Sequence, residues 1–541
     1  MQNLYATEDL DYEAAELDNM YRESGYWSNE RLDVLLTSAA EQWPDHVGVV
    51  DSDRRLTYAE LDVEAWDVAR GLCGLGLTPG AAVILQLPNI SEFVVIWFAC
   101  VRAGLVPIHA TPAHRRSEVT HLAEAGSAEL YVIKDQHARF DYRDLAREVL
   151  DADNAVDRVV VVGDTPTDPR FFAYTDLHTV GTATDSPLSS AGCRELGLLL
   201  LSGGTTGASK LIPRSHCDYL YNARAAAAAT GFDSDSVYLV VLPAAFNFTM
   251  ACPGILGTIA VGGRVVLSAM SDPRANFQLI RDEGVISVAL TPPLALAWAE
   301  EMERVPAQVG SLRVMQVGGA KLEADLAARL ESAFGARVQQ VFGMAEGLIC
   351  LTSLDDSDDV RFHTQGRPMS AGDEVLVVDE NDVDVPDGTP GQLLTRGPYT
   401  IRRYVGSTAA DYRQAFTPNG FYRTGDVVTR REDGNLVVSG RVKDQINRGG
   451  EKYAAAEVEE HLRAHPAIAD AVVVADEKSA TEVCVTAYLR VLGKPVSTVE
   501  ARKWLRERGI ASYKHPDQVR VLDALPLTSL GKIDKKALLD V

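Results

Sequence analysis

Along the first 440 residues, short runs of β-branched and aliphatic residues alternate with longer amphipathic stretches. The clearest short runs lie at residues 82–87, 158–162, 237–242, 264–267 and 313–317. A connection between parallel strands needs a long crossover, and a helix usually supplies it. The alternation therefore predicts α/β layers built on mainly parallel sheets.

The pattern changes between residues 373 and 440. Short strands at 374–378 and 392–395 are separated by turns rich in Gly, Pro, Asn and Asp, which predicts a small antiparallel sheet or barrel. We therefore predict an N-terminal region, residues 1–440, made of two α/β layered subdomains up to about residue 372 and a small β-barrel-like subdomain at about 373–440.

From Gly440 the chain makes a second start, which predicts a small mobile α+β domain at residues 441–541. The pattern gives one helix, two strands, a second helix and a final strand, at residues 455–464, 471–475, 483–489, 498–508 and 519–522. About a hundred residues suffice for a compact domain. Residues 440–444 would be the hinge about which it turns.

Composition narrows the class of protein. The chain has 541 residues, 46% of them hydrophobic, and a formal net charge of −24, so we expect a globular protein that binds neither nucleic acid nor an anionic membrane. The most apolar run, 93–101, is too short to cross a bilayer and predicts a buried helix. The acidic first thirty residues do not resemble a targeting peptide, and seven scattered cysteines fit reduced thiols in a cytoplasm.

The most informative segment is the glycine-rich stretch that follows the apolar strand at 199–201. It reads Ser202-Gly203-Gly204-Thr205-Thr206-Gly207-Ala208-Ser209-Lys210. Glycines let backbone N–H groups approach a phosphate, hydroxyls add donors, and Lys210 adds positive charge. The spacing is not that of a Walker A loop, because Ala208 and Ser209 precede the lysine. On this loop alone, a Gly/Ser/Thr turn without function fits equally well.

Four later segments carry further candidate chemistry. Residues 340–347 form an apolar strand that ends in a turn with Glu346, a carboxylate suited to Mg²⁺ beside substrate phosphates. Asp426 ends a second strand and could accept both hydroxyls of a ribose. The loop 447–452 and the segment 526–532, which holds Lys532, follow. Taken singly, such residues are more often helix caps, turn caps or solvated charges.

In this order the segments resemble the adenylate-forming superfamily of acyl-CoA synthetases and peptide-synthetase adenylation domains, from about residue 30 to the C-terminus. The forms at 210–216, 318–321, 342–347 and 447–452 look most like stand-alone aryl acid adenylating enzymes. Such enzymes activate salicylate or 2,3-dihydroxybenzoate for siderophore-type assembly lines. The resemblance implies attack of a carboxylate on the α-phosphate of ATP, followed by attack of a phosphopantetheine thiol on the acyl adenylate.

The resemblance also implies roles for individual residues. Ser202 to Lys210 would hold the β- and γ-phosphates, Glu346 would bind Mg²⁺, and Asp426 would bind the ribose with help from Arg441. Lys532 would bridge the carboxylate and the α-phosphate, Lys443 would be the hinge residue, and Gly449 and Gly450 would line a thiol tunnel. Other nucleotide contacts would come from residues of two strand ends: Gly318, Gly319, Ala320, Gln340, Val341, Phe342, Gly343, Met344 and Ala345.

For the aryl acid, the resemblance points to the segment 242–254. Asn247 would hydrogen-bond the substrate carboxylate and ortho-hydroxyl, with Phe248, Gly319, Ala320 and Ile349 as walls. Cys252 stands where relatives that prefer the dihydroxy acid carry Ser and salicylate-preferring relatives carry Cys. A thiol is a poor partner for a 3-hydroxyl, so we expect salicylate, although an isolated Cys is more often a small buried apolar residue.

Three positions depart from the family pattern, and two alternatives stay open. Ser209 replaces the usual Pro, Phe342 replaces a common Tyr, and Phe246 replaces the His of close relatives. The chain could instead be an aryl-CoA ligase that uses free coenzyme A, or an inactive homologue that acts as a scaffold. Against the scaffold, the residues expected to carry the chemistry are all present: Lys210, Glu346, Asp426 and Lys532.

Overall fold

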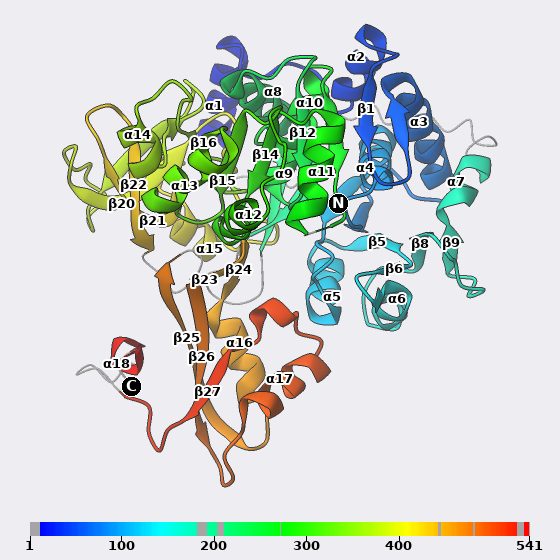
Figure 1. Ribbon diagram of the computed structural model, residues 1–541. Coiled ribbons are helices and arrows are strands. Elements are labelled where there is room, and N and C mark those ends of the chain that lie inside the picture. The colour runs from blue at the N-terminus through cyan, green and yellow to red at the C-terminus, as the bar shows by residue number, and fades with distance from the viewer. Residues whose placement is uncertain are drawn as a thin grey trace.

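Two large, mainly parallel sheets form most of the N-terminal region (Figure 1). The computed structural model describes residues 11–180, 192–202, 210–270, 272–441, 445–479, 482–526 and 535–539. The nine-stranded sheet has the order β18-β17-β16-β15-β14-β12-β13-β1-β2, with antiparallel pairs only towards its two edges. Its strands are β1 (Val47–Val50), β2 (Arg55–Thr57), β12 (Val237–Val240), β13 (Arg264–Leu267), β14 (Ser287–Leu290), β15 (Val314–Gly318), β16 (Arg337–Gly343), β17 (Ile349–Leu351) and β18 (Arg367–Pro368).

The seven-stranded sheet has the order β11-β10-β4-β3-β5-β8-β9 and is parallel except at the β10–β11 edge. Its strands are β3 (Ala82–Gln86), β4 (Val106–His109), β5 (Ala128–Lys134), β8 (Arg158–Val162), β9 (Phe171–Ala173), β10 (Leu196–Leu201) and β11 (Leu211–Ser215). The expected parallel α/β layers are therefore confirmed.

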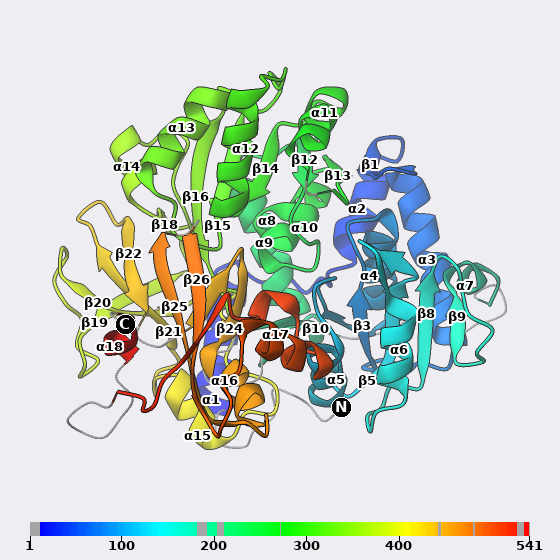
Figure 2. The same cartoon turned by 60° about the horizontal axis from the view of Figure 1, so that its bottom comes forward.

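Helices cover the faces of both sheets (Figures 1 and 2). They are α1 (Asp11–Glu23), α2 (Val34–Gln42), α3 (Tyr58–Gly74), α4 (Ser91–Ala103), α5 (Arg116–Ala125), α6 (Tyr142–Leu150), α7 (Tyr174–Val180), α8 (His216–Thr230), α9 (Asn247–Ala251), α10 (Gly254–Ala260), α11 (Pro273–Glu283), α12 (Pro292–Arg304), α13 (Ala324–Phe334), α14 (Asp358–His363) and α15 (Ala409–Ala415).

The largest apolar core joins the two sheets through α4. Phe93 to Val101 are all buried, as the apolar run predicts, and they share one cluster with Val83 of β3 and Val240 of β12. Separate clusters cover the other face of each sheet. Parallel strands that are buried on both faces read as continuous apolar runs, which is why the sequence revealed them. No helix among the described residues has the length and apolarity needed to cross a membrane.

A four-stranded antiparallel sheet follows the last strand of the nine-stranded sheet in the chain. This arrangement agrees with the turn-rich pattern of the sequence. The strand expected at 392–395 is longer in the structure and spans residues 390–396. The strands are β19 (Glu374–Val378), β20 (Pro390–Arg396), β21 (Tyr422–Arg430) and β22 (Leu436–Arg441).

The C-terminal part is a smaller α+β unit, which lies below the large sheets in Figure 1. Its three-stranded sheet packs on α16 and α17, and the hairpin β23–β24 and the short helix α18 are features that the sequence pattern did not predict. The elements are β23 (Gln445–Arg448), β24 (Glu451–Ala454), α16 (Ala455–Arg463), β25 (Ile468–Ser479), β26 (Glu482–Val491), α17 (Thr498–Glu507), a 3-10 turn (Ser512–Lys514), β27 (Gln518–Val521) and α18 (Lys535–Leu539).

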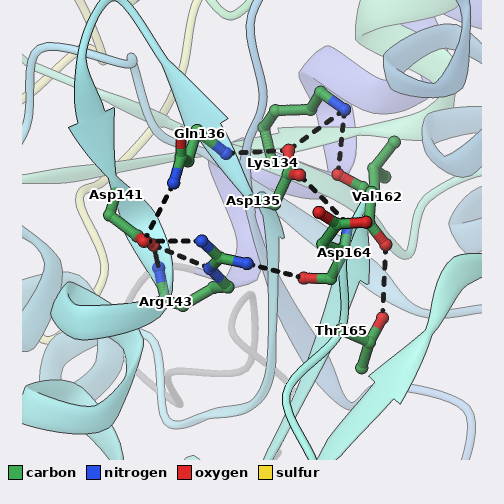
Figure 3. Close-up of polar contacts among 9 residues, drawn as sticks. Lys134, Asp135, Gln136, Asp141, Arg143, Val162, Asp164 and Thr165 are labelled. Atoms are coloured by element: carbon green, nitrogen blue, oxygen red, sulfur yellow. Dashed lines mark hydrogen bonds and ion pairs between the residues drawn. The ribbon is translucent and has the colours of Figure 1, made fainter.

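A polar network closes the carboxyl ends of β5 and β8, far along the seven-stranded sheet from the glycine loop (Figure 3). Lys134 Nζ donates to Val162 O at 3.1 Å, and Asp164 N donates to Asp135 Oδ2 at 3.0 Å. Arg143 Nη1 donates to Asp164 O at 3.2 Å. These groups hydrogen-bond one another and hold the two strand ends together, so the network is structural.

Candidate active site

The glycine loop leaves and returns at the edge of the seven-stranded sheet, where β10 and β11 are antiparallel neighbours. Its two ends are tied together, because Ser202 Oγ accepts a hydrogen bond from Lys210 N and Ser202 N donates to Lys210 O, both at 2.9 Å. Residues 203–209 lie outside the described residues. Phosphate binding by this loop therefore stays a prediction.

Lys210 and Glu346 meet at one phenol. Lys210 Nζ lies 5.0 Å from the centroid of the Tyr404 ring, and Tyr404 Oη donates to Glu346 Oε1 at 2.8 Å. A second phenol, Tyr422 Oη, lies 2.9 Å from that of Tyr404. Burial and the Glu346 carboxylate raise the pKa of Tyr404, so it stays a donor at neutral pH. The Lys210 ammonium thus lies near the Tyr404 ring, and the buried Glu346 carboxylate accepts a hydrogen bond from the hydroxyl of the same side chain.

Glu346 has one carboxylate oxygen that could bind a magnesium ion. The carboxylate is buried, and Oε2 has no donor among the residues that the structure describes. Over the same residues, no group of three or more His, Cys, Asp or Glu side chains gathers to hold a metal ion. Mg²⁺ takes one or two protein carboxylates when substrate phosphates and water supply its other ligands, so one free oxygen fits it.

A buried guanidinium links the strand after the glycine loop to the turn that carries Glu346. Arg214 has no exposed side-chain surface; its Nη1 donates to Ala345 O at 3.0 Å and its Nε donates to Asp218 Oδ1 at 2.8 Å. The guanidinium carbon lies 4.7 Å from the Tyr219 ring centroid. Arg214 thus connects the strand after the predicted phosphate loop to Ala345, one of the other predicted nucleotide contacts.

The other predicted nucleotide contacts come together at the carboxyl ends of β15 and β16, which are parallel neighbours. Gly318 ends β15 and Gly319 and Ala320 follow it, while the segment 342–345 spans the end of β16, so both sets lie at one edge of the nine-stranded sheet. Such an edge is where open α/β sheets bind ligands. The individual contacts stay predictions.

The Gln340 side chain does not reach that edge. Its Nε2 donates to the carbonyls of Arg361 at 2.9 Å and Phe362 at 3.1 Å, and its Oε1 accepts from Gln365 Nε2 at 3.1 Å. Gln340 is 2% exposed, and its side-chain hydrogen bonds hold the end of α14. Its backbone is also engaged, because Gln340 N donates to Thr352 Oγ1 at 2.9 Å and Gln340 O accepts from Thr352 N at 3.2 Å. A nucleotide contact of Gln340 stays a prediction.

Asp426 lies on β21 directly across from Arg441 on β22. It is 3% exposed, and its backbone N donates to Thr424 Oγ1 at 3.0 Å. The Arg441 side chain lies outside the described residues. The strand register therefore places the predicted ribose ligand and its predicted helper side by side.

Asn247 starts α9 with its amide already oriented. Tyr219 Oη donates to Asn247 Oδ1 at 2.9 Å, which turns the Nδ2 end of the amide away from Tyr219. An amide N–H₂ is a donor pair suited to a carboxylate or an ortho-hydroxyl. This orientation agrees with the predicted role of Asn247, which stays a prediction.

Cys252, Phe248 and Ile349, three of the residues predicted for the aryl acid, lie in one cluster, which we call the acid-site cluster. It is made of Cys252, Val341, Ile349, Leu351 and Tyr399, with Phe248, Tyr221 and Met369 packed against it. The Phe248 ring lies close to the chain at Gly318, where a Cβ would come within 3.1 Å of Phe248 Cε1 and 2.6 Å of Val341 O. Burial raises the pKa of Cys252 to about 12, so this residue is a neutral thiol.

The hairpin β23–β24 of the C-terminal unit reaches the same place. Asn447 Nδ2 donates to Gly319 O at 2.6 Å, and Gly450 N donates to Asn447 Oδ1 at 3.2 Å. A Cβ on Gly450 would lie 3.0 Å from Thr291 Cγ2 and 3.8 Å from Phe246 Cε2. The loop predicted to line a thiol tunnel thus packs beside two predicted wall segments.

Lys532 and Lys443 lie outside the described residues, so their roles stay predictions. The described helix α18 follows Lys532 in the chain. Leu538 shares a cluster with Val472 and Tyr488, and Tyr488 Oη donates to Leu538 O at 2.5 Å. That cluster lies on the face of the β25–β26 ladder opposite α16 (Figure 1).

Four residues at the site escaped the sequence interpretation: Tyr404, Tyr219, Thr291 and Tyr399. Tyr404 lies 58 positions from Glu346, and Tyr219 lies 28 positions from Asn247, so no local spacing connects either pair. Tyr399 Oη donates to Asp373 Oδ2 at 2.6 Å and accepts from Ile349 N at 3.2 Å. No motif in the sequence marks these tyrosines, and only the fold reveals what each hydroxyl contacts.

Comparison with known proteins gives matches over nearly the whole chain. The profile of the family described as AMP-binding enzyme matches residues 36–405, and that of the AMP-binding enzyme C-terminal domain matches residues 457–532. Residues 36–405 are well over half of the chain.

Three relatives with assigned activities are similar over almost their full length. A salicyl-AMP ligase / salicyl-S-ArCP synthetase of Mycobacterium tuberculosis is 45% identical, covering 96% of this chain and 92% of that protein. A 2,3-dihydroxybenzoate-AMP ligase of Bacillus subtilis is 44% identical, covering 97% and 96%. A salicylyl-CoA synthase / salicylate adenylyltransferase of a Streptomyces species is 46% identical, also covering 97% and 96%.

Among solved structures, the apo structure of MbtA from Mycobacterium smegmatis is similar in both fold and sequence. It is 45% identical, covers 97% of this chain and 97% of its own, and has a TM-score of 0.74. The α/β architecture with a large N-terminal and a small C-terminal part is therefore shared.

Proposed function

Since the chain belongs to the AMP-binding enzyme family, we propose that it activates an aryl carboxylic acid with ATP and passes the acyl group to a phosphopantetheine thiol. The chain is an adenylate-forming ligase of the aryl acid type, similar to the salicyl-AMP and 2,3-dihydroxybenzoate-AMP ligases over at least 96% of its length. Salicylate is the proposed acid, and 2,3-dihydroxybenzoate is the next candidate.

One observation carries the proposed substrate class: the donor end of Asn247 and the flat side chain of Phe248 start the same short helix beside the acid-site cluster. A planar acid needs apolar walls and one or two placed polar groups. Cys252 at the end of that helix supports salicylate, because a thiol offers a 3-hydroxyl little.

In the first half-reaction, a carboxylate oxygen of the acid attacks the α-phosphorus of ATP and pyrophosphate leaves. Lys210 and the glycine loop are proposed to hold the β- and γ-phosphates, while Asp426 accepts the ribose hydroxyls. Lys532 is proposed to lie between carboxylate and α-phosphate, because an ammonium there offsets the repulsion of two anions as charge develops at phosphorus.

Magnesium is proposed as the accompanying ion, with Glu346 as its protein ligand. Bound Mg²⁺ neutralises phosphate charge and favours the departure of pyrophosphate. Tyr404 donates to one oxygen of Glu346 and so orients the other. Arg214 fixes the backbone next to it through Ala345.

In the second half-reaction, the sulfur of the thiol attacks the acyl carbon of the aryl adenylate and AMP leaves with the bonding electrons. The Gly449–Gly450 loop beside Gly319 and Phe246 supports a path for the thiol at this place. We propose the thiol of an aryl carrier protein, as in the similar salicyl-S-ArCP synthetase. Free coenzyme A is the alternative, favoured by the similar salicylyl-CoA synthase.

The seven cysteines are all unpaired, which supports a reducing compartment and the cytoplasmic location expected from the sequence.

The decisive experiment measures pyrophosphate release with benzoic, 2-hydroxybenzoic, 2,3-dihydroxybenzoic, 3-hydroxybenzoic and picolinic acids. Thiolation of a carrier protein and of coenzyme A is then measured with the best acid. We expect 2-hydroxybenzoate to be best and the carrier protein to be the better acceptor. Release with none of these acids would refute the proposed substrate class, and faster transfer to coenzyme A would select the alternative acceptor.

A further inference from the structure

The N-terminal region and the C-terminal unit meet at a buried cluster of three charged side chains. Lys514 Nζ lies 3.0 Å from Glu118 Oε1 and 2.6 Å from Glu457 Oε1. Glu118 belongs to α5 of the N-terminal region, whereas Lys514 and Glu457 belong to the C-terminal unit. The side chains are 2%, 7% and 12% exposed for Lys514, Glu118 and Glu457. We call these three residues the interdomain ion cluster.

Glu118 connects the two parts by more than its charge. Its Oε1 also accepts a hydrogen bond from Ala511 N at 3.2 Å, and its Oε2 accepts from Arg115 N at 2.9 Å to cap its own helix. Next to it, Ser117 N donates to Gly509 O at 3.2 Å. The first turn of α5 therefore docks on the segment 509–514 through both backbone and side chain.

The electrostatics of the cluster depend on this docking. Burial alone lowers the pKa of a lysine, but Glu118 and Glu457 raise that of Lys514 above its ordinary value. Burial by itself raises the pKa of Glu118, but the Lys514 ammonium, His114 and the hydrogen bonds from Arg115 N and Lys514 together lower it below its ordinary value. A buried charge that loses its partner is strongly unfavourable, whereas a complete buried pair adds little net stability. The cluster thus selects one orientation of the two parts more than it stabilises either.

The selected orientation is the one that brings the β23–β24 hairpin to the acid site. Glu451 of this hairpin accepts from Thr111 Oγ1 at 3.3 Å, and Asn447 donates to Gly319 O at 2.6 Å. Thr111 follows β4 and lies a few residues before Glu118 in the chain. One docking surface therefore fixes both the ion cluster and the position of Gly450.

We propose that Glu118, Lys514 and Glu457 are positioning residues for the thiol-transfer half-reaction, which hold the C-terminal unit where the Gly449–Gly450 loop faces the acyl adenylate. The inference rests on the proposed function for the meaning of that orientation. Because Lys532 must approach the nucleotide in the other half-reaction, the cluster is expected to be open during adenylation. Weakening it should slow transfer and spare adenylation.

The test is the variant Glu118→Gln, which keeps the shape of the side chain but removes its charge and one of its two acceptor oxygens. Single-turnover transfer from preformed aryl adenylate to the thiol should fall at least tenfold. Adenylation, measured by pyrophosphate exchange, should stay within twofold of the parent. The matched control is Glu507→Gln, which breaks the exposed Lys503–Glu507 pair of the same unit and should change neither step.

A second readout does not need activity. Spin labels at Val383 and Val499, exposed positions on the two parts, report their separation after Cys73 and Cys484 are replaced by Ser. Glu118→Gln should broaden the distance distribution and Glu507→Gln should not. Unchanged transfer with an unchanged distribution overturns the inference, and so does an equal fall of both half-reactions. A parent protein that forms no adenylate refutes the proposed function, while the distance measurement still decides on the cluster.

Discussion

Lys210 and Glu346 lie 136 positions apart in the chain and share one side chain, Tyr404, whose ring carries the ammonium at 5.0 Å and whose hydroxyl donates to the carboxylate at 2.8 Å. The first prediction follows from this arrangement. Tyr404→Phe keeps the ring below Lys210 but removes the donor from a buried carboxylate. Hydrogen bonds to charged groups are worth about 1.5–3 kcal/mol, so the KM for MgATP should rise roughly tenfold or more.

The control for that prediction is Tyr422→Phe, because Tyr422 contacts the Tyr404 hydroxyl and not Glu346. Its effect on the KM for MgATP should be clearly smaller, while the KM for the acid should stay the same in both variants. Equal effects of the two variants would show that the tyrosine pair acts through packing alone.

The second prediction concerns Lys532. Lys532→Ala should nearly abolish aryl adenylate formation, measured by pyrophosphate exchange, because the ammonium is proposed to stabilise charge that develops only in the transition state. The melting temperature should stay close to that of the parent. The matched control is Lys494→Ala, a lysine of the same unit without an assigned role, which should keep full exchange. Retained exchange in Lys532→Ala would remove the proposed mechanism.

The third prediction concerns the choice of acid. Cys252 is 4% exposed and belongs to the acid-site cluster. Cys252→Ser should shift the ratio of kcat/KM values towards 2,3-dihydroxybenzoate over salicylate by about 1–2 kcal/mol, since a hydroxyl gains a hydrogen-bond partner. Competition between the two acids in one reaction measures the ratio directly. If the ratio does not move, Cys252 does not face the 3-position of the ring.

The fourth prediction separates two adjacent glycines. A Cβ on Gly450 would lie 3.0 Å from Thr291 Cγ2, whereas a Cβ on Gly449 meets nothing within 4 Å, and both residues have positive φ. Gly450→Ala should therefore slow thiol transfer much more than Gly449→Ala does. Pyrophosphate exchange should be close to normal in both. Similar transfer rates for the two variants would argue that the loop does not pack here during transfer.

Strands with both faces buried were the easiest elements to predict from the sequence. The runs at 158–162 and 264–267 match the bounds of β8 and β13, because β-branched residues between turn-forming ones leave little choice. The hairpin β23–β24 was missed, since its sequence is polar and rich in Gly and its pairing depends on docking to Gly319 and Thr111. Strand patterns specify local backbone, whereas docking depends on distant partners.

Some residues of the candidate site could likewise be predicted from the sequence, and others could not. The motif around Glu346 and the segment around Asn247 could be found by resemblance, but not the phenols of Tyr404 and Tyr219 that orient them. A tyrosine hydroxyl at the end of an apolar side chain leaves no spacing in the sequence. Gln340 is the opposite case, because it lies within a motif while its side chain serves α14.

The fifth prediction concerns Asp373, which lies behind the acid-site cluster and accepts from Tyr399 Oη at 2.6 Å. Burial raises its pKa from 3.8 to about 7. The folded protein therefore keeps a proton on Asp373 that the unfolded chain releases above about pH 4. Where the native state binds more protons, stability falls as pH rises, so this group lowers stability progressively from about pH 4 to 7 and by a constant amount above that.

Asp373→Asn removes the titration and keeps an acceptor for Tyr399. At pH 8 the variant should unfold at a higher temperature than the parent, and the difference should shrink towards pH 5, where the parent is protonated as well. A three-unit shift corresponds to a few kcal/mol at most, on the order of 1.4 kcal/mol per unit. Parallel melting curves for the two proteins from pH 5 to 8 would contradict a buried neutral Asp373. Tyr399 Oη also accepts a hydrogen bond from Ile349 N of the acid-site cluster. If Asp373→Asn disturbs the hydrogen bond between Tyr399 and residue 373, the KM for the acid should therefore rise and the KM for ATP should stay the same.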